Sequence, residues 1–196
     1  MLSGEPPVWA RRWRGLPLPL RRVAERLGLL PPRDVLLVCV ARQRMIHRRW
    51  DPKAECHLTA GVWRISTARA GVHNAEGSRG TPPGLHRVAR RIGGGWPVGA
   101  VWKGRRFAGW TWRGQPDAAI AHRILWLEGL EPGINRGGHV DSFARYIYIH
   151  GVGDETTLGR PASSGCIHLA AKDLLPLFDR LEEGAWVWIA ERLAGE

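Results

Sequence analysis

The sequence has 196 residues, of which 44% are hydrophobic, which is enough apolar material for one globular domain and too much for a disordered chain. Lys and Arg outnumber Asp and Glu by 29 to 18, and the resulting charge of +11 favours an anionic partner: a nucleic acid, a membrane surface or a substrate rich in carboxylates. The basic residues are scattered along the chain instead of gathering on one helix or arm, so the charge does not by itself predict a nucleic-acid-binding protein.

Residues 1–33 are rich in Pro and Arg, and we predict that they form an N-terminal extension of a domain that spans 34–196. Within this extension, PLRRVAERLGLL favours a short basic amphipathic helix that ends at Gly28 and the prolines after it. We expect the extension to pack on the periphery of the domain, and the alternative is a contact with an acidic surface.

The sequence lacks the ~18 consecutive apolar residues of a membrane-spanning helix, and its N-terminal residues lack the pattern of a signal peptide. We therefore expect a cytoplasmic protein without a transmembrane segment. A periplasmic location is the alternative, because an exported form could carry a leader that this sequence does not include.

From Asp34 onward, apolar and alternating runs are separated by Gly and Pro, which indicates a core made of β-strands. The first run, DVLLVCVA, is continuously apolar and is typical of a buried strand, in which Cys39 is a small hydrophobic residue. Most of the eleven Trp residues, including Trp63, Trp102 and Trp188, lie in such runs and are expected in the core. The other predicted strands are RQRMIHRRW, AGVWRISTA, GLHRVARRI, AVWKGRRFAGWTW, ILWLEGL, RYIYIHG and AWVWIAE.

One helix is predicted after the third cysteine, within IHLAAKDLLPLFDRLEEG. Asp173 is the predicted N-cap, and Gly184 fits the position after the C-terminal end. Cys166 then lies in a loop between the strand RYIYI and this helix. An apolar stripe with spacings of three and four residues is formed by Leu174, Leu177, Phe178 and Leu181.

The stretch HGVGDETTLGRPASSGCIHL contains the residues that suggest chemistry. A thiol reacts as the thiolate, and a histidine within reach of Cys166 can take its proton and later deliver it to a leaving amine. His150 ends the preceding strand, and the Gly151 carbonyl can hold its other ring nitrogen. Backbone N–H groups near Gly165 can point at a developing oxyanion. We also expect the start of the helix to lower the pKa of the sulfur through its dipole.

Two other interpretations of these residues remain open. In the first, Cys166 is a buried free cysteine and His150 is a histidine at the end of a strand, without a catalytic role. In the second, His150, Cys166 and His168 bind zinc, although the sequence offers no obvious fourth ligand and no close cysteine pair. The three cysteines of the chain lack C-x-x-C spacing, so neither a disulfide framework nor a metal site is predicted.

The pair HG and SSGCIHL, together with GTPPG at residues 80–84, resembles the signature of the L,D-transpeptidase catalytic domain, the YkuD-like family. The resemblance covers roughly residues 34–191. It implies a mainly β fold, a sandwich or barrel of mixed sheets with a helix after the cysteine. It also implies that Cys166 is the nucleophile, His150 the general base and acid, and Gly151 the orienting carbonyl. Gly165 and Cys166 would supply the oxyanion donors.

The sequence departs from the family pattern at two positions. Ser164 stands where many members have a second histidine, and His168 stands where Arg or Asn is usual. Both residues are nevertheless predicted to contact the substrate. The segment 126–142 is expected to form one wall of the cleft, with Asn135 as a further candidate contact. The complete set of predicted substrate-binding residues is Ser163, Ser164, His168, Arg136, His139 and Asp141.

The resemblance implies a substrate, the stem tetrapeptide of peptidoglycan, cleaved between the L-centre of diaminopimelate and D-Ala through a thioester on the cysteine. The expected partners are stem peptides or muropeptides, and no metal, cofactor or nucleic acid is expected. Hydrolysis would make the protein an L,D-carboxypeptidase of peptidoglycan recycling, which the expected cytoplasmic location favours. The alternative is a transpeptidase that forms crosslinks, and a remote alternative is a basic nucleic-acid binder without enzymatic activity.

Overall fold

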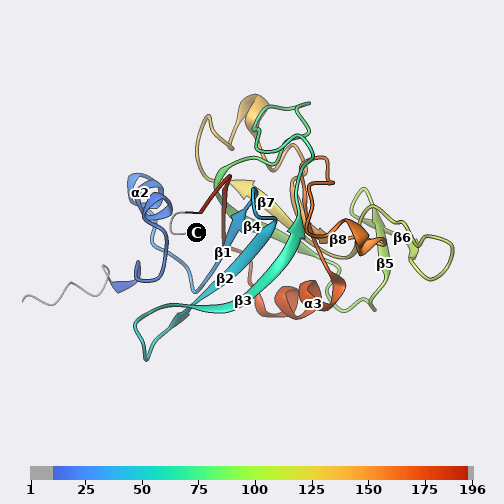
Figure 1. Ribbon diagram of the computed structural model, residues 1–196, viewed down its shortest axis with the longest axis horizontal. Coiled ribbons are helices and arrows are strands. Elements are labelled where there is room, and N and C mark those ends of the chain that lie inside the picture. Colours follow the sequence, from blue (N-terminus) through green and yellow to red (C-terminus); the bar gives the residue numbers. More distant parts are fainter. Residues whose placement is uncertain (1–10, 194–196) are drawn as a thin grey trace, which may run out of the picture.

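The computed structural model describes residues 11–193. Its elements are mostly strands, as the sequence predicts (Figure 1). The helices are α2 (Leu18–Arg26) and α3 (Ala171–Arg180), and short 3-10 turns span Gly138–Val140 and Glu155–Thr157. The strands are β1 (Asp34–Cys39), β2 (Arg44–Asp51), β3 (Cys56–Ser66), β4 (Gly84–Ile92), β5 (Ala100–Lys103), β6 (Arg106–Trp110), β7 (Ala121–Gly129), β8 (Tyr148–Gly151), β9 (Ile167–Leu169) and β10 (Trp186–Ala190).

The strands form a single sheet that closes on itself. They follow the order β4-β10-β1-β2-β3-β9-β8-β7-β5-β6, and a further pairing of β4 with β7 completes the ring. Most pairs are antiparallel, whereas β1 pairs with β10 and β8 with β9 in parallel. The β5–β6 hairpin branches from β7 outside the ring. The predicted mainly β fold, a barrel-like mixed sheet with a helix after the cysteine, is therefore confirmed.

The main core fills the inside of the closed sheet. All six residues of β1 are buried, which fits the continuous apolar run of DVLLVCVA, and Cys39 is 1% exposed. The helix α3 packs against β7 and β8 and contributes its apolar stripe to the same core. Burial of such stripes is the main favourable contribution to the stability of the fold.

The N-terminal residues from 11 onward pack on the outer face of the sheet. The helix α2 is amphipathic, and its Leu20 and Ala24 are fully buried with Trp13 against strands β1, β4 and β10. The predicted helix therefore exists, and it lies on the domain. The boundary at residue 33 stays a prediction, and residues 1–10 lie outside the described part of the chain. Within residues 11–193, no helix is long and apolar enough to cross a membrane.

Two details of the predicted C-terminal helix are wrong. The helix starts at Ala171 after the N-cap Ala170, so Asp173 lies in its first turn instead of capping it. It ends at Arg180, and Leu181 is the C-cap in place of an ending at Gly184. The short strand β9 stands between Cys166 and this helix because its residues complete the sheet between β3 and β8.

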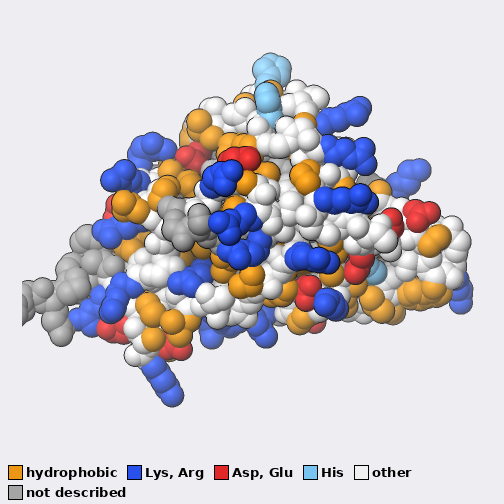
Figure 2. Space-filling model, viewed as in Figure 1, with side chains coloured by type: hydrophobic (Ala, Val, Ile, Leu, Met, Phe, Trp, Pro, Cys, Tyr) orange, Lys and Arg blue, Asp and Glu red, His pale blue; other side chains and the backbone are white. Residues whose placement is uncertain are grey.

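The arginines are spread over the surface, as their spacing in the sequence predicts. Figure 2 shows Lys and Arg side chains distributed across the face in view, with few Asp and Glu among them. The Trp residues divide into two groups. Trp102 is 7% exposed and Trp63 and Trp188 are partly buried against the core clusters, whereas Trp96 and Trp112 are exposed.

Candidate active site

The strands β8 and β9 bring His150 and Cys166 to the same face of the sheet. They pair in parallel with Ile149 opposite Ile167 and His150 opposite His168. Side chains alternate along a strand, so Cys166 and His168 share their face with Tyr148 and His150. The rings of His150 and His168 lie 4.8 Å apart between centroids, which agrees with this assignment.

His150 is held in one tautomer. Its side chain is buried, and the Nδ1–H group donates to the Gly151 carbonyl oxygen at 2.8 Å, as predicted for this glycine. The other ring nitrogen, Nε2, is then the basic one. Gly151 itself has no room for a side chain, because a Cβ there would lie 2.4 Å from the His122 ring and 2.8 Å from the Ala121 carbonyl oxygen.

Cys166 is a thiol in its resting state. Burial raises its pKa to about 11, although the Tyr148 backbone and the Arg145 charge act in the opposite direction. Burial, together with His168, lowers the pKa of His150 to about 3. The expected lowering of the thiol pKa by the helix dipole is wrong, because β9 separates the sulfur from α3. The resting pair is therefore a neutral thiol and a neutral imidazole.

The thiol forms a hydrogen bond with the connection between β7 and β8. Sγ donates to the carbonyl oxygen of Tyr146 at 3.5 Å. Tyr146 adopts a left-handed backbone conformation, with φ of +58°, which is unusual for a residue with a large side chain. This bond directs the S–H group toward the β7–β8 connection.

Ser163 stabilises the loop that precedes the cysteine. Its hydroxyl donates to the Cys166 carbonyl oxygen at 2.6 Å and accepts from the Gly165 N–H group at 3.2 Å. The Gly165 N–H group is thus engaged within the loop, which leaves the Cys166 N–H group as the better candidate oxyanion donor. Gly165 has φ of +128°, and a Cβ there would lie 3.1 Å from Ile147 and 3.3 Å from the Gly80 carbonyl oxygen.

An open cavity of about 540 Å³ lies over these residues. It includes the predicted contacts Ser163, Ser164 and His168. Sequence reasoning missed three charged residues in its lining, Arg69, Asp117 and Asp154. Arg69 and Asp117 stand in loops remote in the sequence from the motif, whereas Asp154 lies within it, four residues after His150. The cavity is lined by Arg69, Asp117, Ala118, Ala119, Ile120, His150, Val152, Asp154, Thr157, Ala162, Ser163, Ser164, Cys166 and His168.

The other three predicted contacts lie outside the lining of this cavity. Arg136 is near the Glu128 carboxylate, at 3.9 Å, and the exposed His139 is near Glu76, at 3.8 Å. Asp141 accepts hydrogen bonds from the backbone N–H groups of Gly137 and Ala144. All three belong to the connection between β7 and β8, and the hydrogen bonds of Asp141 lie within that connection.

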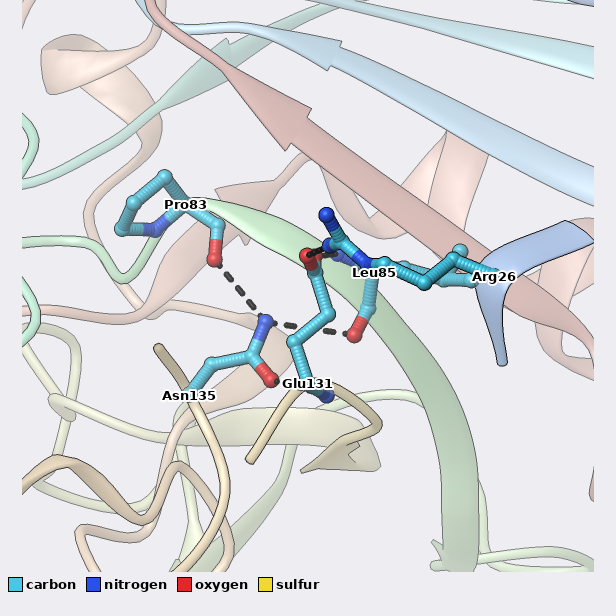
Figure 3. Close-up of polar contacts among 5 residues, drawn as sticks. All are labelled: Arg26, Pro83, Leu85, Glu131 and Asn135. Atoms are coloured by element: carbon cyan, nitrogen blue, oxygen red, sulfur yellow. Dashed lines mark hydrogen bonds and ion pairs between the residues drawn. The ribbon is translucent and has the colours of Figure 1, made fainter. Parts of the chain in front are cut away.

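Asn135 is a structural residue. It is fully buried, and its amide nitrogen donates to the carbonyl oxygens of Pro83 at 2.9 Å and Leu85 at 3.2 Å (Figure 3). The buried Glu131 accepts from the Leu85 N–H group at 2.7 Å and forms an ion pair with Arg26 of α2. These contacts join the connection between β7 and β8 to the strand that follows the GTPPG turn.

Arg145 is a further residue that the sequence reasoning did not identify. Its guanidinium donates to the carbonyl oxygens of Asn74 at 2.7 Å and Gly80 at 2.9 Å, and its charge lowers the pKa of Cys166 against the effect of burial. The only feature of the sequence that could have identified Arg145 is its position five residues before His150. It is anchored to the GTPPG turn through Gly80, and its charge acts on Cys166.

Within residues 11–193, no three His, Cys, Asp or Glu side chains are grouped so as to hold a metal ion. This finding includes His150, Cys166 and His168, the alternative zinc site of the sequence analysis. The two imidazole rings approach each other in a tilted arrangement, with their planes inclined by 56°.

The site has the features that a cysteine nucleophile needs. It contains a buried histidine of fixed tautomer, a cysteine on the same face of the sheet and an open cavity over both. The sequence matches the L,D-transpeptidase catalytic domain family, YkuD, over residues 34–189, and the chain belongs to this family. It is an L,D-transpeptidase-family enzyme.

Solved structures with TM-scores above 0.5 share the fold. Bd1075 of Bdellovibrio bacteriovorus has a TM-score of 0.54 and 13% identity, over 83% of this chain and 49% of that one. The helical cell shape determining protein Pgp2 of Campylobacter jejuni has a TM-score of 0.52 and 17% identity, over 81% and 48%. An L,D-transpeptidase from Mycobacterium smegmatis has a TM-score of 0.47 and 13% identity, over 81% of this chain and 58% of that one. The chain thus spans about half the length of the first two, and no curated protein matches it significantly.

Proposed function

We propose that this protein cleaves the bond between the L-centre of diaminopimelate and D-Ala in peptidoglycan stem tetrapeptides through a thioester on Cys166, with water as the acyl acceptor. The observation that carries this proposal is the placement of the fixed His150 base and the Cys166 thiol on one sheet face beneath an open cavity. Membership of the L,D-transpeptidase catalytic domain family supports the same chemistry.

The first half of the reaction follows from the neutral resting pair. Nε2 of His150 takes the thiol proton as the sulfur attacks the carbonyl carbon, because neither group ionises alone near neutral pH. The developing oxyanion accepts a hydrogen bond from the Cys166 N–H group. The imidazolium then gives its proton to the leaving amine, and the C–N bond breaks to release D-Ala and leave the thioester.

The second half uses the same imidazole. His150 removes a proton from water, the hydroxyl attacks the thioester carbonyl, and the thiolate leaves and recovers the proton from the imidazolium. The Gly151 carbonyl keeps the ring oriented throughout and stabilises its charged form.

The charged residues of the cavity suit the ends of the stem peptide. Arg69 is exposed in the cavity and supplies a cation for a substrate carboxylate, while Asp117 and Asp154 supply acceptors for the amino group of diaminopimelate. The charge of +11 attracts a substrate that carries several carboxylates over longer distances.

The cavity is open, so water can reach a thioester on Cys166. A volume of about 540 Å³ is suited to one ligand. Crosslinking requires a second stem peptide to approach the same thioester. This transpeptidation is the second candidate, which the match to the L,D-transpeptidase catalytic domain favours.

The test is digestion of purified tetrapeptide and disaccharide-tetrapeptide, followed by mass spectrometry. We expect release of D-Ala and a tripeptide product that chelator does not reduce, and a loss of at least about a thousandfold in rate for Cys166→Ala and for His150→Ala. Cys56→Ala is the matched control, because Cys56 is also partly exposed but lies outside the cavity, and it should retain activity.

The products distinguish the alternatives. A crosslinked dimer or an exchanged D-amino acid in place of the tripeptide would support transpeptidation. Unchanged activity in Cys166→Ala would contradict both reactions, and a salt-sensitive complex with DNA or RNA without any peptide cleavage would favour the nucleic-acid binder. The cytoplasmic location stays a prediction, and fractionation of the producing cells would check it.

A further inference from the structure

The β5–β6 hairpin and the segments beside it form a surface rich in aromatic rings. We call Trp96, Phe107, Trp110 and Trp112 the aromatic surface. Trp112 is 57% exposed, and Trp96 and Phe107 are each 39% exposed, although large apolar side chains usually lie in the core. Figure 2 shows hydrophobic side chains along the edge of the molecule where Figure 1 places β5 and β6.

The rings of the aromatic surface hold one another in place. Trp96 stacks on Phe107 with centroids 4.4 Å apart and planes inclined by 22°, and Trp110 stacks on Trp112 at 4.7 Å with the same inclination. Phe107 joins the two pairs through an edge contact with Trp110 at 5.0 Å. Such mutual packing fixes the rings before any ligand binds, which lowers the entropic cost of binding.

The aromatic surface and the active site share a buried cluster. Trp110 and Cys166 both pack against the buried cluster that contains Trp102 and Tyr148. Ile120 belongs to this cluster and also lines the cavity over Cys166. The segment from Asp117 to Ile120, which begins seven residues after the last residue of β6, forms part of the cavity lining.

We propose that the aromatic surface binds sugar rings of the glycan that carries the stem peptide, so that the enzyme prefers a glycan-linked stem to a free peptide. The proposal rests on the proposed function, which places the peptide in the adjoining cavity. The apolar C–H face of a pyranose packs against the electron-rich face of an aromatic ring, and neighbouring rings suit neighbouring sugars.

The hairpin is less suited to a membrane or a nucleic acid. Its tip consists of Lys103, Gly104, Arg105 and Arg106, and a charged tip opposes insertion into a lipid core. Arg105 is itself engaged, since its guanidinium lies 4.9 Å from the Trp126 ring and 4.7 Å from the Tyr146 ring. These contacts hold the Arg105 side chain toward the active site, where it is poorly placed to bind the phosphates of a nucleic acid.

The first experiment compares the cleavage of disaccharide-tetrapeptide and free tetrapeptide by the wild type and by the double variant Phe107→Ala, Trp112→Ala. We expect the double variant to raise KM for the disaccharide-linked substrate about tenfold and to leave the free peptide unaffected. The control is Leu58→Ala, which removes another exposed apolar side chain, far from the hairpin on β3, and should change neither. Equal effects on both substrates, or no effect on either, would overturn the proposal.

The second experiment does not depend on cleavage. The Cys166→Ala protein is mixed with glycan strands from which the stem peptides have been removed, and the bound fraction is measured by sedimentation. Binding that the double variant reduces about tenfold supports the proposal even if the wild type cleaves neither peptide, which would defeat the proposed function alone. Absence of glycan binding, or binding only to anionic lipid vesicles or single-stranded DNA, would overturn it.

Discussion

At the scale of single residues, His150 is a base and Cys166 is an acid, and burial keeps both of them neutral. The Gly151 carbonyl fixes which ring nitrogen is basic, and the Tyr146 carbonyl holds the thiol. A neutral pair costs less to bury than an ion pair. The sulfur therefore gains its reactivity when the substrate is in place and the proton transfers.

The alkylation rate of Cys166 tests this neutral pair. With a pKa of about 11, only about one thiol in ten thousand is ionised at pH 7. We expect the rate of reaction with iodoacetamide in the free enzyme, followed by mass spectrometry, to be slow at pH 7 and to rise about tenfold per pH unit up to pH 10. A fast rate that is independent of pH from 6 to 9 would instead show a thiolate–imidazolium pair.

At the scale of elements, the connection between β7 and β8 is attached to the start of β4 by buried polar side chains. Gly84 has φ of +95°, and a Cβ there would lie 2.3 Å from the Glu131 carboxylate and 2.8 Å from the Asn135 amide nitrogen. The glycine that ends the GTPPG turn is thus required by the approach of these side chains. The turn reaches the active site through Gly80, whose carbonyl accepts from Arg145.

The substitution Asn135→Ala should destabilise the protein by about 3 kcal/mol, because it removes three hydrogen bonds and leaves buried backbone groups without partners. Asn135→Asp should cost more, since it loses the donors and sets a second carboxylate beside Glu131. Urea unfolding measures both. Asn74→Ala is the control, because Asn74 donates a single exposed hydrogen bond, to Ile134, and should cost less than about 1 kcal/mol. Equal costs at positions 74 and 135 would contradict the structural role of Asn135.

These elements also show what the sequence could predict. The continuous apolar run of β1 and the spacing of α3 identify both elements, because burial on all sides or along one stripe leaves a local pattern. The motif residues identify His150 and Cys166. The three residues of β9 are too few to carry a period, and its position between β3 and β8 depends on long-range pairing. In the sequence, Asn135 resembles an exposed loop residue. It is buried because the start of β4 packs against it, which is a contact between residues far apart in the sequence.

At the scale of the whole molecule, the closed sheet buries several histidines in neutral form. Burial lowers the pKa of His86 to about 4, and His86 is fully buried with its ring between the Gly84 carbonyl and the Ser142 hydroxyl. Burial also lowers the pKa of His168 to about 4, and burial with His168 lowers that of His150 to about 3. The ordinary pKa of 6.5 applies to the same groups in the unfolded chain.

These shifts make stability depend on pH in a definite direction. Between about pH 6.5 and pH 4, the unfolded chain binds protons that the folded protein excludes, so the free energy of unfolding falls as the pH falls, by roughly 1.4 kcal/mol per pH unit for each histidine concerned. We expect the urea midpoint to be steady from pH 8 to pH 7 and to drop steeply below pH 6. The charge of +11 would also lower stability through repulsion, but 0.5 M salt screens repulsion between exposed charges and leaves burial unchanged. A drop that salt abolishes, or a midpoint that is constant from pH 7 to pH 4.5, would show that the buried histidines do not set the acid limit of the fold.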